Sequence, residues 1–297
     1  MKTFFIISEN LVIFCLLFFS IPLHPQEKPG TLIETDEFLS IFKQSNIDSE
    51  LKISKSKYKI SEKDGWYYAS GQSEAEIKNN EALNFFIKEK NVKMAIEAFE
   101  KVLNKFPMFL PARLNSGRLY FLNDKYEKSL YHYKQALRFY SKHYKVHEAI
   151  AKVYEKLNNF NLAEKHYRAA FKYNRANVQP LSYLIKMFAN RQRFSEARDI
   201  FRYAQNINGS HNHLLTAAGF LYFKQKKYYD ALLFFDAVQI KKDYDKIFHY
   251  YKAETCLRLN LNDKAFLEYE KLLLYPETLK EHKISESYIN RILGKLK

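Results

Sequence analysis

The feature that most constrains this chain of 297 residues is a pattern that recurs every 34 residues. In each occurrence a small residue is followed four places later by an aromatic one. The six pairs are Ala95 and Phe99, Ser129 and Tyr133, Ala163 and Tyr167, Ala197 and Phe201, Ala231 and Phe235, and Ala265 and Tyr269. A fixed period of this length without insertions is typical of repeat proteins, in which each unit stacks on the next.

The spacing inside each unit predicts two antiparallel helices. An apolar residue follows the aromatic by three places, as Ala170 follows Tyr167, so with Ala163 these residues share one helical face. Polar turns such as Asn123–Asp124 separate the two halves of a unit. The small residue allows the two helices to approach closely, and the aromatic fills the space toward the neighbouring unit.

The period and the Ala-x-x-x-Phe or Tyr signature resemble the tetratricopeptide repeat family, with Gly117 and Gly219 at the small position of the first helix and Pro107 at a repeat end. The tryptophan that the family carries early in the repeat is absent, and Asn79 stands there in the first unit. The resemblance implies an all-α fold, a right-handed α-solenoid of six helix-turn-helix repeats with a C-terminal capping helix. It also implies a concave groove lined by the first helix of each repeat.

The repeats are expected to fill residues 73–279, in units at 76–109, 110–143, 144–177, 178–211, 212–245 and 246–279. Ser73 and Glu76 predict a capping box at the start of the first helix. An apolar stripe between Ile284 and Leu296 predicts a terminal capping helix within residues 280–297. Only seven Gly and seven Pro occur, which argues against sandwich, barrel and Rossmann-type folds.

The first 25 residues predict an export signal or a membrane anchor. Lys2 precedes an uninterrupted apolar run from Leu11 to Phe19, and prolines follow at positions 22 and 25. Whether the segment is cleaved stays open. Residues 26–72 are expected to form a polar linker, with a small packed piece around Trp66 or with no ordered structure at all. The expected location is therefore the bacterial periplasm or cell envelope, either exported or membrane-anchored.

Positive charge is concentrated in the middle of the predicted groove. Of the formal net charge of +15, the second, third and fourth repeats carry +5, +4 and +3. Arg118, Lys152 and Lys186 share the middle position of three consecutive first helices, and Tyr183 and Phe220 lie beside them in the pattern. This set predicts a groove for an acidic partner segment, unless the cations only solvate exposed helix faces.

The family resemblance adds a second group of candidate residues. Asn84, Asn115 and Lys145 match three of the five positions with which some members of the family grip a C-terminal carboxylate. The other two positions, basic in those members, hold Asn80 and Ala149. A complete clamp is therefore not expected, although Asn115 could still hydrogen-bond the backbone of a partner.

The sequence predicts a non-catalytic protein-binding scaffold or adaptor that docks an acidic or carboxylate-bearing segment. One alternative is a chaperone or assembly factor for exported proteins; another is a binder of acidic envelope polymer or anionic lipid. No phosphate loop or nucleophile motif indicates an enzyme or a cofactor. His143 and His147 have metal-ligand spacing but no evident third ligand, so no metal is expected. Nucleic acid is not expected as a partner, and the oligomeric state is not predicted.

Overall fold

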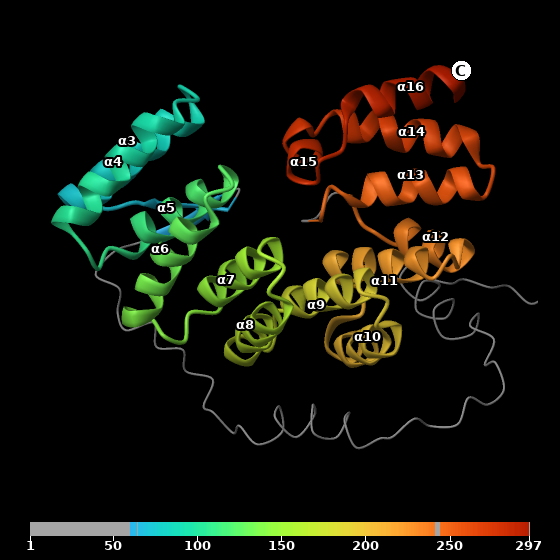
Figure 1. The fold of residues 1–297 in the computed structure, drawn as a ribbon, viewed down its shortest axis with the longest axis horizontal. Helices are drawn as coiled ribbons and strands as arrows, with labels where there is room; N and C mark the ends of the chain where they lie inside the picture. The colour runs from blue at the N-terminus through green and yellow to red at the C-terminus, as the bar shows by residue number, and fades with distance from the viewer. Residues whose placement is uncertain (1–59, 64, 241–243, 297) are drawn as a thin grey trace, which may run out of the picture. The chain divides into compact units, whose positions relative to one another are not determined.

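The computed structural model describes residues 60–63, 65–240 and 244–296, which belong to one compact unit, residues 48–297. The described residues form fourteen α-helices and one antiparallel β-hairpin (Figure 1). The predicted export signal or anchor at residues 1–25 lies outside the described residues, as does most of the segment 26–72. None of the described helices combines the length and the apolar character needed to cross a membrane.

Twelve of the helices form six antiparallel pairs, one for each 34-residue unit. The pairs are α3 (Glu74–Ile87) with α4 (Val92–Lys105), α5 (Leu110–Leu122) with α6 (Tyr126–Phe139), α7 (Tyr144–Lys156) with α8 (Phe160–Tyr173), α9 (Gln179–Asn190) with α10 (Phe194–Asn208), α11 (Asn212–Lys224) with α12 (Tyr228–Asp236), and α13 (Phe248–Arg258) with α14 (Asn262–Leu273). The predicted all-α helix-turn-helix repeat fold is confirmed.

The repeating residues form the core between the helices. Each member of the small column and of the aromatic column is buried, from Ala95 and Phe99 to Ala265 and Tyr269. At Gly219 in α11, an added Cβ would lie 2.5 Å from the ring of Phe235. The aromatic side chain of the second helix therefore lies directly against the backbone of the first, and this contact sets how closely the two helices approach.

Each first helix ends in the same backbone conformation. One residue per turn has a left-handed φ between 55° and 60°, and these residues are again 34 apart: Lys90, Asp124, Asn158, Gln192, Lys226 and Asn260. The next residue then donates its N–H back into the helix, as Lys125 does to the carbonyl of Tyr120 at 2.9 Å. This is a Schellman motif, which satisfies carbonyl groups at the helix end and reverses the chain into the second helix.

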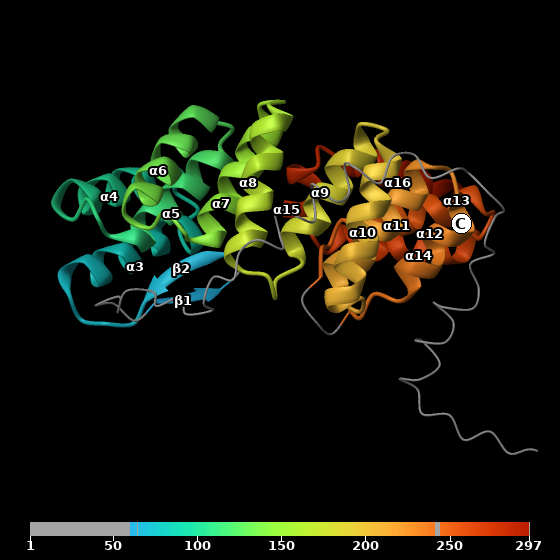
Figure 2. The same ribbon diagram turned by 90° about the horizontal axis from the view of Figure 1, so that it is seen from below.

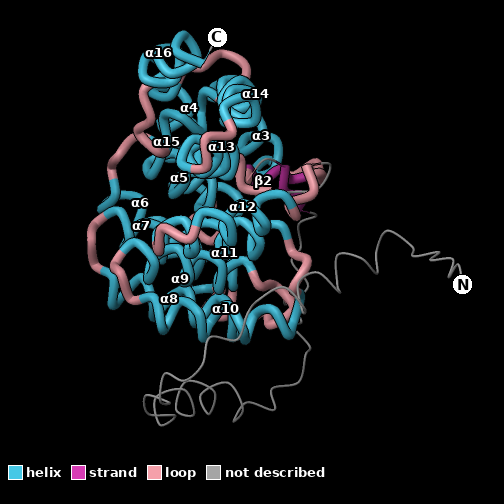
Figure 3. The backbone as a smooth tube through the Cα atoms, turned by 90° about the vertical axis from the view of Figure 1, so that its right-hand side faces the viewer, coloured by secondary structure: helices cyan, strands magenta, loops and turns pink. Residues whose placement is uncertain are grey.

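The N-terminal end of the stack carries a two-stranded sheet. Strands β1 (Ile60–Lys63) and β2 (Trp66–Ala69) pair antiparallel, with Lys63 opposite Trp66. Figure 3 shows these strands in a described chain that is otherwise helix and loop. The sheet packs through β2 on α3 and α5 (Figure 2). The predicted capping box of Ser73 and Glu76 is present at the start of α3.

Two further helices close the C-terminal end, α15 (Pro276–Glu281) and α16 (Glu286–Leu296). Ile289 and Leu293 of α16 are buried in one cluster with Tyr269 and Leu272 of the sixth repeat. Residues 280–297, expected to form one capping helix, thus contain the end of α15 and all of α16. Pro276 begins α15, where its missing N–H leaves no hydrogen bond unmade.

Candidate functional site

The first helices α3, α5, α7, α9, α11 and α13 contact one another from repeat to repeat, and their common surface is here called the first-helix face. Contacts join α3 to α5, α5 to α7, α9 to α11 and α11 to α13. Lys152 on α7 reaches the ring of Tyr183 on α9, which connects the remaining pair. Every site residue predicted from the sequence lies on these helices.

Strand β2 lies on this face and is held there through its backbone. The N–H of Tyr67 donates to Asn115 Oδ1 at 2.9 Å, and Asn115 Nδ2 donates to the carbonyl of Tyr67 at 2.8 Å. Asn80 makes the same pair of bonds with Ala69, at 3.1 and 2.6 Å. Asn79 adds a second amide donor to the Tyr67 carbonyl at 3.0 Å. These three residues, here called the asparagine clamp, bond β2 as a neighbouring strand would.

The asparagine clamp is itself a connected network. Asn115 Nδ2 also lies 3.1 Å from Asn79 Oδ1, and Asn79 Nδ2 lies 3.2 Å from Asn80 Oδ1. Asn79 and Asn115 are fully buried beneath the strand. Buried amide groups are stable only when hydrogen-bonded, and the backbone of β2 supplies the partners that α3 and α5 do not.

The side chains of the hairpin also contact this face. Trp66 is buried, with its ring centroid 4.9 Å from that of Phe86 and the Arg118 guanidinium 4.6 Å above it. Both contacts are in the range of favourable aromatic and cation–π interactions. Gly65, with φ 75°, brings the turn so close that an added Cβ would overlap the Arg118 guanidinium.

Lys145 binds the opposite side of the hairpin. Its ammonium forms an ion pair with Glu62 on β1 and lies 6.0 Å from the ring centroid of Tyr67. Burial lowers the pKa of Lys145, and burial raises the pKa of Tyr67. Asn115, Arg118 and Lys145, predicted from the sequence to hold a partner, are therefore all in contact with a segment of their own chain.

The remaining predicted cations form a second group, here called the central cluster, with Glu148, Tyr183 and Asp245. Lys152 lies 2.9 Å from a Glu148 oxygen, and Lys186 lies 2.6 Å from an Asp245 oxygen. Both ammonium groups lie over the Tyr183 ring, at 4.3 and 5.1 Å from its centroid. Burial alone would raise the pKa of Asp245, but Lys186 outweighs it and holds that pKa well below its usual range. The positive charge predicted for this region is thus paired within the chain.

The last two predicted residues lie apart from both groups. Phe220 is buried on α11 with its ring centroid 4.6 Å from that of Tyr251, edge to face. Asn84 on α3 is exposed. The sequence analysis did not assign Asn79, Asn80 or Asp245 to the site. The Asp-Gly pair before Trp66 favours a turn, but the hairpin and the place where it docks were not predicted from the sequence.

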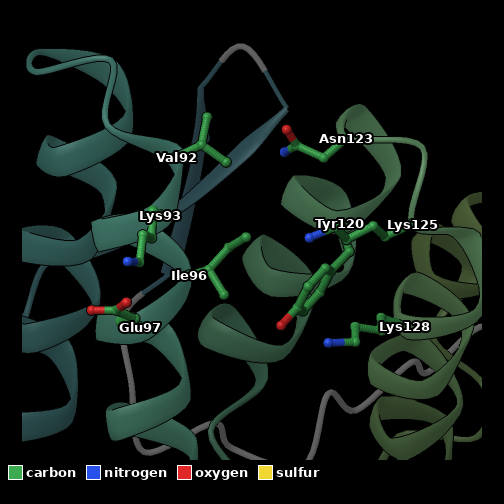
Figure 4. A pocket seen from close by; sticks show the side chains of 8 residues that line it. All are labelled: Val92, Lys93, Ile96, Glu97, Tyr120, Asn123, Lys125 and Lys128. Atoms are coloured by element: carbon green, nitrogen blue, oxygen red, sulfur yellow. The ribbon is translucent and has the colours of Figure 1, made fainter.

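Other candidate sites lie off the first-helix face. A hollow of about 330 Å³ between α4, α5 and α6 is lined by Val92, Lys93, Ile96, Glu97, Tyr120, Asn123, Lys125 and Lys128 (Figure 4). Its lining combines the apolar side chains of Val92 and Ile96 with three lysines and Glu97. His147 Nδ1 lies 3.0 Å from His166 Nδ1, and its Nε2 lies 2.9 Å from the Ser141 carbonyl. Among the described residues, no three His, Cys, Asp or Glu side chains are placed to hold a metal ion.

Comparison with known proteins decides what kind of repeat this is. Residues 148–213 match the tetratricopeptide repeat family. The chain has a tetratricopeptide-type repeat fold. Proteins of this kind are interaction scaffolds and are typically non-catalytic.

Two relatives share parts of this repeat array. Over 214 residues the chain is 23% identical to anaphase-promoting complex subunit 3 of Schizosaccharomyces pombe, covering 72% of this chain and 26% of that protein. Over 95 residues it is 29% identical to protein bimA of Emericella nidulans, covering 32% of this chain and 12% of that one. The chain therefore spans about a quarter or less of the length of these relatives.

Solved structures show the same fold at low identity. A tetratricopeptide repeat protein from Parabacteroides merdae superposes with a TM-score of 0.51 at 16% identity, over 75% of this chain and 98% of that one. The hetero-tetramer Cut9-Hcn1 of the APC/C gives a TM-score of 0.56 at 16% identity, over 75% of this chain and 42% of the other. At such identity the likeness concerns the fold alone.

Proposed function

We propose that this protein is a non-catalytic scaffold that binds an extended segment of a partner protein on its first-helix face. The observation that carries the proposal is the asparagine clamp. It bonds both the N–H and the C=O of an extended strand from side chains on two consecutive repeats. Main-chain bonds of this kind give affinity for any extended peptide, and pockets for its side chains give specificity.

The chemistry around the clamp supports an acidic, aromatic-containing partner. Lys145 pairs with Glu62 of the hairpin, and Arg118 and Phe86 contact Trp66. A partner segment with an acidic residue and an aromatic residue would make the same contacts. The central cluster offers less support for an acidic polymer or anionic lipid, since Lys152 and Lys186 already have carboxylate partners.

The relatives support a role in assembly with other proteins. Anaphase-promoting complex subunit 3 is, by its name, a subunit of a multi-protein complex, and it shares 72% of this chain at 23% identity. The cell-envelope location is a separate part of the proposal and rests on the apolar run from Leu11 to Phe19 after Lys2.

Site-specific photo-crosslinking in cells tests the binding face. A crosslinking amino acid replaces Asn84, exposed on a first helix, or Tyr229, which is 76% exposed on the second helix α12. The proposal predicts a discrete crosslinked protein from position 84 and none from position 229. The same products from both positions, or products from position 229 alone, would contradict it.

Fractionation of the producing cells tests the location. The native chain, detected by antibody, is expected in the envelope fraction, and N-terminal sequencing of that material shows whether the first segment has been removed. Recovery of the whole chain in the cytosol would contradict the envelope location while leaving the binding face untouched.

A further inference from the structure

We propose that strand β2 is an internal ligand that holds the N-terminal part of the first-helix face closed, and that an extended partner segment with an aromatic residue displaces it. This proposal rests on the proposed function, because it assigns the same face a competitor from the chain itself. It also defines the partner chemically: a segment in β conformation whose aromatic side chain takes the place of Trp66.

The bonds that hold β2 do not depend on its sequence. All five hydrogen bonds from the asparagine clamp to the strand go to backbone atoms of Tyr67 and Ala69. Any extended segment presents the same N–H and C=O groups at the same spacing. Another chain can therefore make these bonds in place of β2, one for one.

The polarity of the buried surface favours an exchangeable contact over a permanent cap. Asn79 and Asn115 are fully buried beneath the strand, where apolar side chains would be expected in a fixed core. Amides bond equally well to water, so the clamp residues still find hydrogen-bond partners when the strand leaves. Trp66 and Ala69 of the hairpin also belong to the apolar cluster of the first repeats, so a competitor must supply apolar side chains at these two positions. The C-terminal cap α16 is held in a comparable apolar cluster through Ile289 and Leu293.

The side-chain contacts identify what a competitor needs. Trp66 fits between Phe86 and Arg118, and Ala69, only 2% exposed, leaves no room for a large residue at the second clamped position. Lys145 adds a partner for one carboxylate. An aromatic residue, a small residue three places later and a nearby acidic residue reproduce the contacts of the hairpin.

The covalent connection sets how strong a competitor must be. Only the residues from Ser70 to Ser73 separate β2 from α3, so the strand competes at a local concentration of the order of millimolar. An isolated two-stranded hairpin is at best marginally stable in water, so the displaced strand has no folded alternative. The apparent affinity of a partner is therefore its intrinsic affinity multiplied by the fraction of molecules in which β2 is open.

Hydrogen exchange of the full chain tests whether the strand opens by itself. The backbone amides of Tyr67 and Ala69 donate to side chains of the clamp. Local opening predicts that they exchange faster than the amides in the centre of α5, at a rate unaffected by stabilising the repeats. Exchange of both groups together, by global unfolding alone, would show a permanent cap and overturn the proposal.

A variant outside the binding face tests the competition. Gly65→Val places a β-branched residue at φ 75°, against the Arg118 guanidinium, and so destabilises docking of the hairpin. The probe is a dye-labelled peptide with the sequence of residues 65–73, and Gly294→Ala, at an open site on α16, is the matched control. We expect the Gly65→Val chain to bind the peptide about tenfold more tightly than the wild type, and the control to bind like the wild type.

The outcomes separate the two proposals. Equal binding by the wild type and Gly65→Val would still show a peptide site on this face, but it would overturn the proposal that β2 competes for that site. Unchanged hydrogen exchange of β2 in Gly65→Val would likewise show that the strand is a fixed cap. Absence of binding in a Gly65→Val chain whose β2 amides have become exposed would contradict the proposed function itself. Adding Asn115→Ala to Gly65→Val is expected to abolish binding, which places the peptide at the clamp.

Discussion

At the scale of single residues, the packing of the two helices in a repeat depends on a residue without a bulky side chain at one position of the first helix. Gly117 and Gly219 lie against the rings of Tyr133 and Phe235, where an added Cβ would come within 2.5 Å of each ring. The aromatic rings are buried between two helices and have no free direction in which to move. A single methyl group at these glycines must therefore separate the helices or tilt the ring.

We expect Gly219→Ala to lower the free energy of unfolding by about 1–3 kcal/mol, because it overpacks the contact with Phe235. The matched control is Gly294→Ala in α16, where nothing lies within 4 Å of the added Cβ. The control is expected to raise stability by about 0.5–1 kcal/mol through helix propensity. Urea unfolding followed by circular dichroism measures both, and a neutral Gly219→Ala would contradict the helix packing.

A second prediction at this scale concerns pH. Burial, with His147, Lys165 and Lys134 nearby, lowers the pKa of His166 to about 4 from 6.5. Between these values the unfolded chain binds more protons than the folded one, so stability falls as the pH drops from about 6.5 to about 4. We expect His166→Gln to flatten part of this fall in thermal melts, and an unchanged pH profile would contradict a half-buried, neutral His166.

The residues of the core could be predicted from the sequence, but the pairing of the charges could not. The aromatic and small columns follow the period of the chain, which is a local property. Lys186 was expected to face a partner because it repeats the charge of Arg118 and Lys152 in the neighbouring first helices. Its actual partner, Asp245, lies 59 positions further along the chain and is not part of that repeated position. A contact of that separation depends on the stacking of the fourth and fifth repeats and leaves no periodic trace in the sequence.

At the scale of secondary-structure elements, the turn between the two helices of each repeat imposes a left-handed residue. Asn and Asp tolerate this conformation, and they occupy it at positions 124, 158 and 260. Lys90, Gln192 and Lys226 occupy it without that advantage. The polar turns were predicted from the sequence, but the strained position within them was not, because lysine and glutamine give no conformational signal.

Replacing Lys226 with glycine is expected to stabilise the chain by about 0.5–1 kcal/mol, because glycine adopts φ 60° without a steric penalty. The same replacement at Lys165, in the middle of α8, is expected to destabilise it by about 1 kcal/mol. Thermal unfolding of the two variants should therefore shift in opposite directions. A loss of stability in Lys226→Gly would show that the turn differs from the one described.

The hairpin illustrates the limit of prediction for an element. Asp64-Gly65 before an aromatic run favours a turn, and the sequence left open whether the region around Trp66 is a small packed piece or has no ordered structure. It did not indicate that the strand would be bonded by Asn115, which lies 48 positions away from Tyr67. Asn79 stands at the position of the family's tryptophan, but neither this departure nor the asparagines at positions 80 and 115 indicates a strand that would cover them.

At the scale of the whole array of repeats, the two ends differ in how they are covered. The C-terminal end is closed by apolar packing of α16. The N-terminal end is closed by a strand whose backbone is bonded to polar side chains, while its Trp66 and Ala69 join the apolar cluster of the first repeats. In a stacked array each repeat is stabilised by its neighbours, so the terminal repeats depend on what covers them. The exchangeable cover thus lies at the end where we place the partner.

The most direct test of this account is the fluorescence of Trp66, the single tryptophan of the chain. Docked against Phe86 and Arg118 it is 6% exposed, so we predict blue-shifted emission that acrylamide quenches poorly. The double variant Asn80→Ala, Asn115→Ala should shift the emission to the red and raise quenching, while the circular dichroism of the helices persists. Emission of a fully exposed tryptophan in the wild type, unchanged in the double variant, would contradict the docking of an extended strand on the first-helix face.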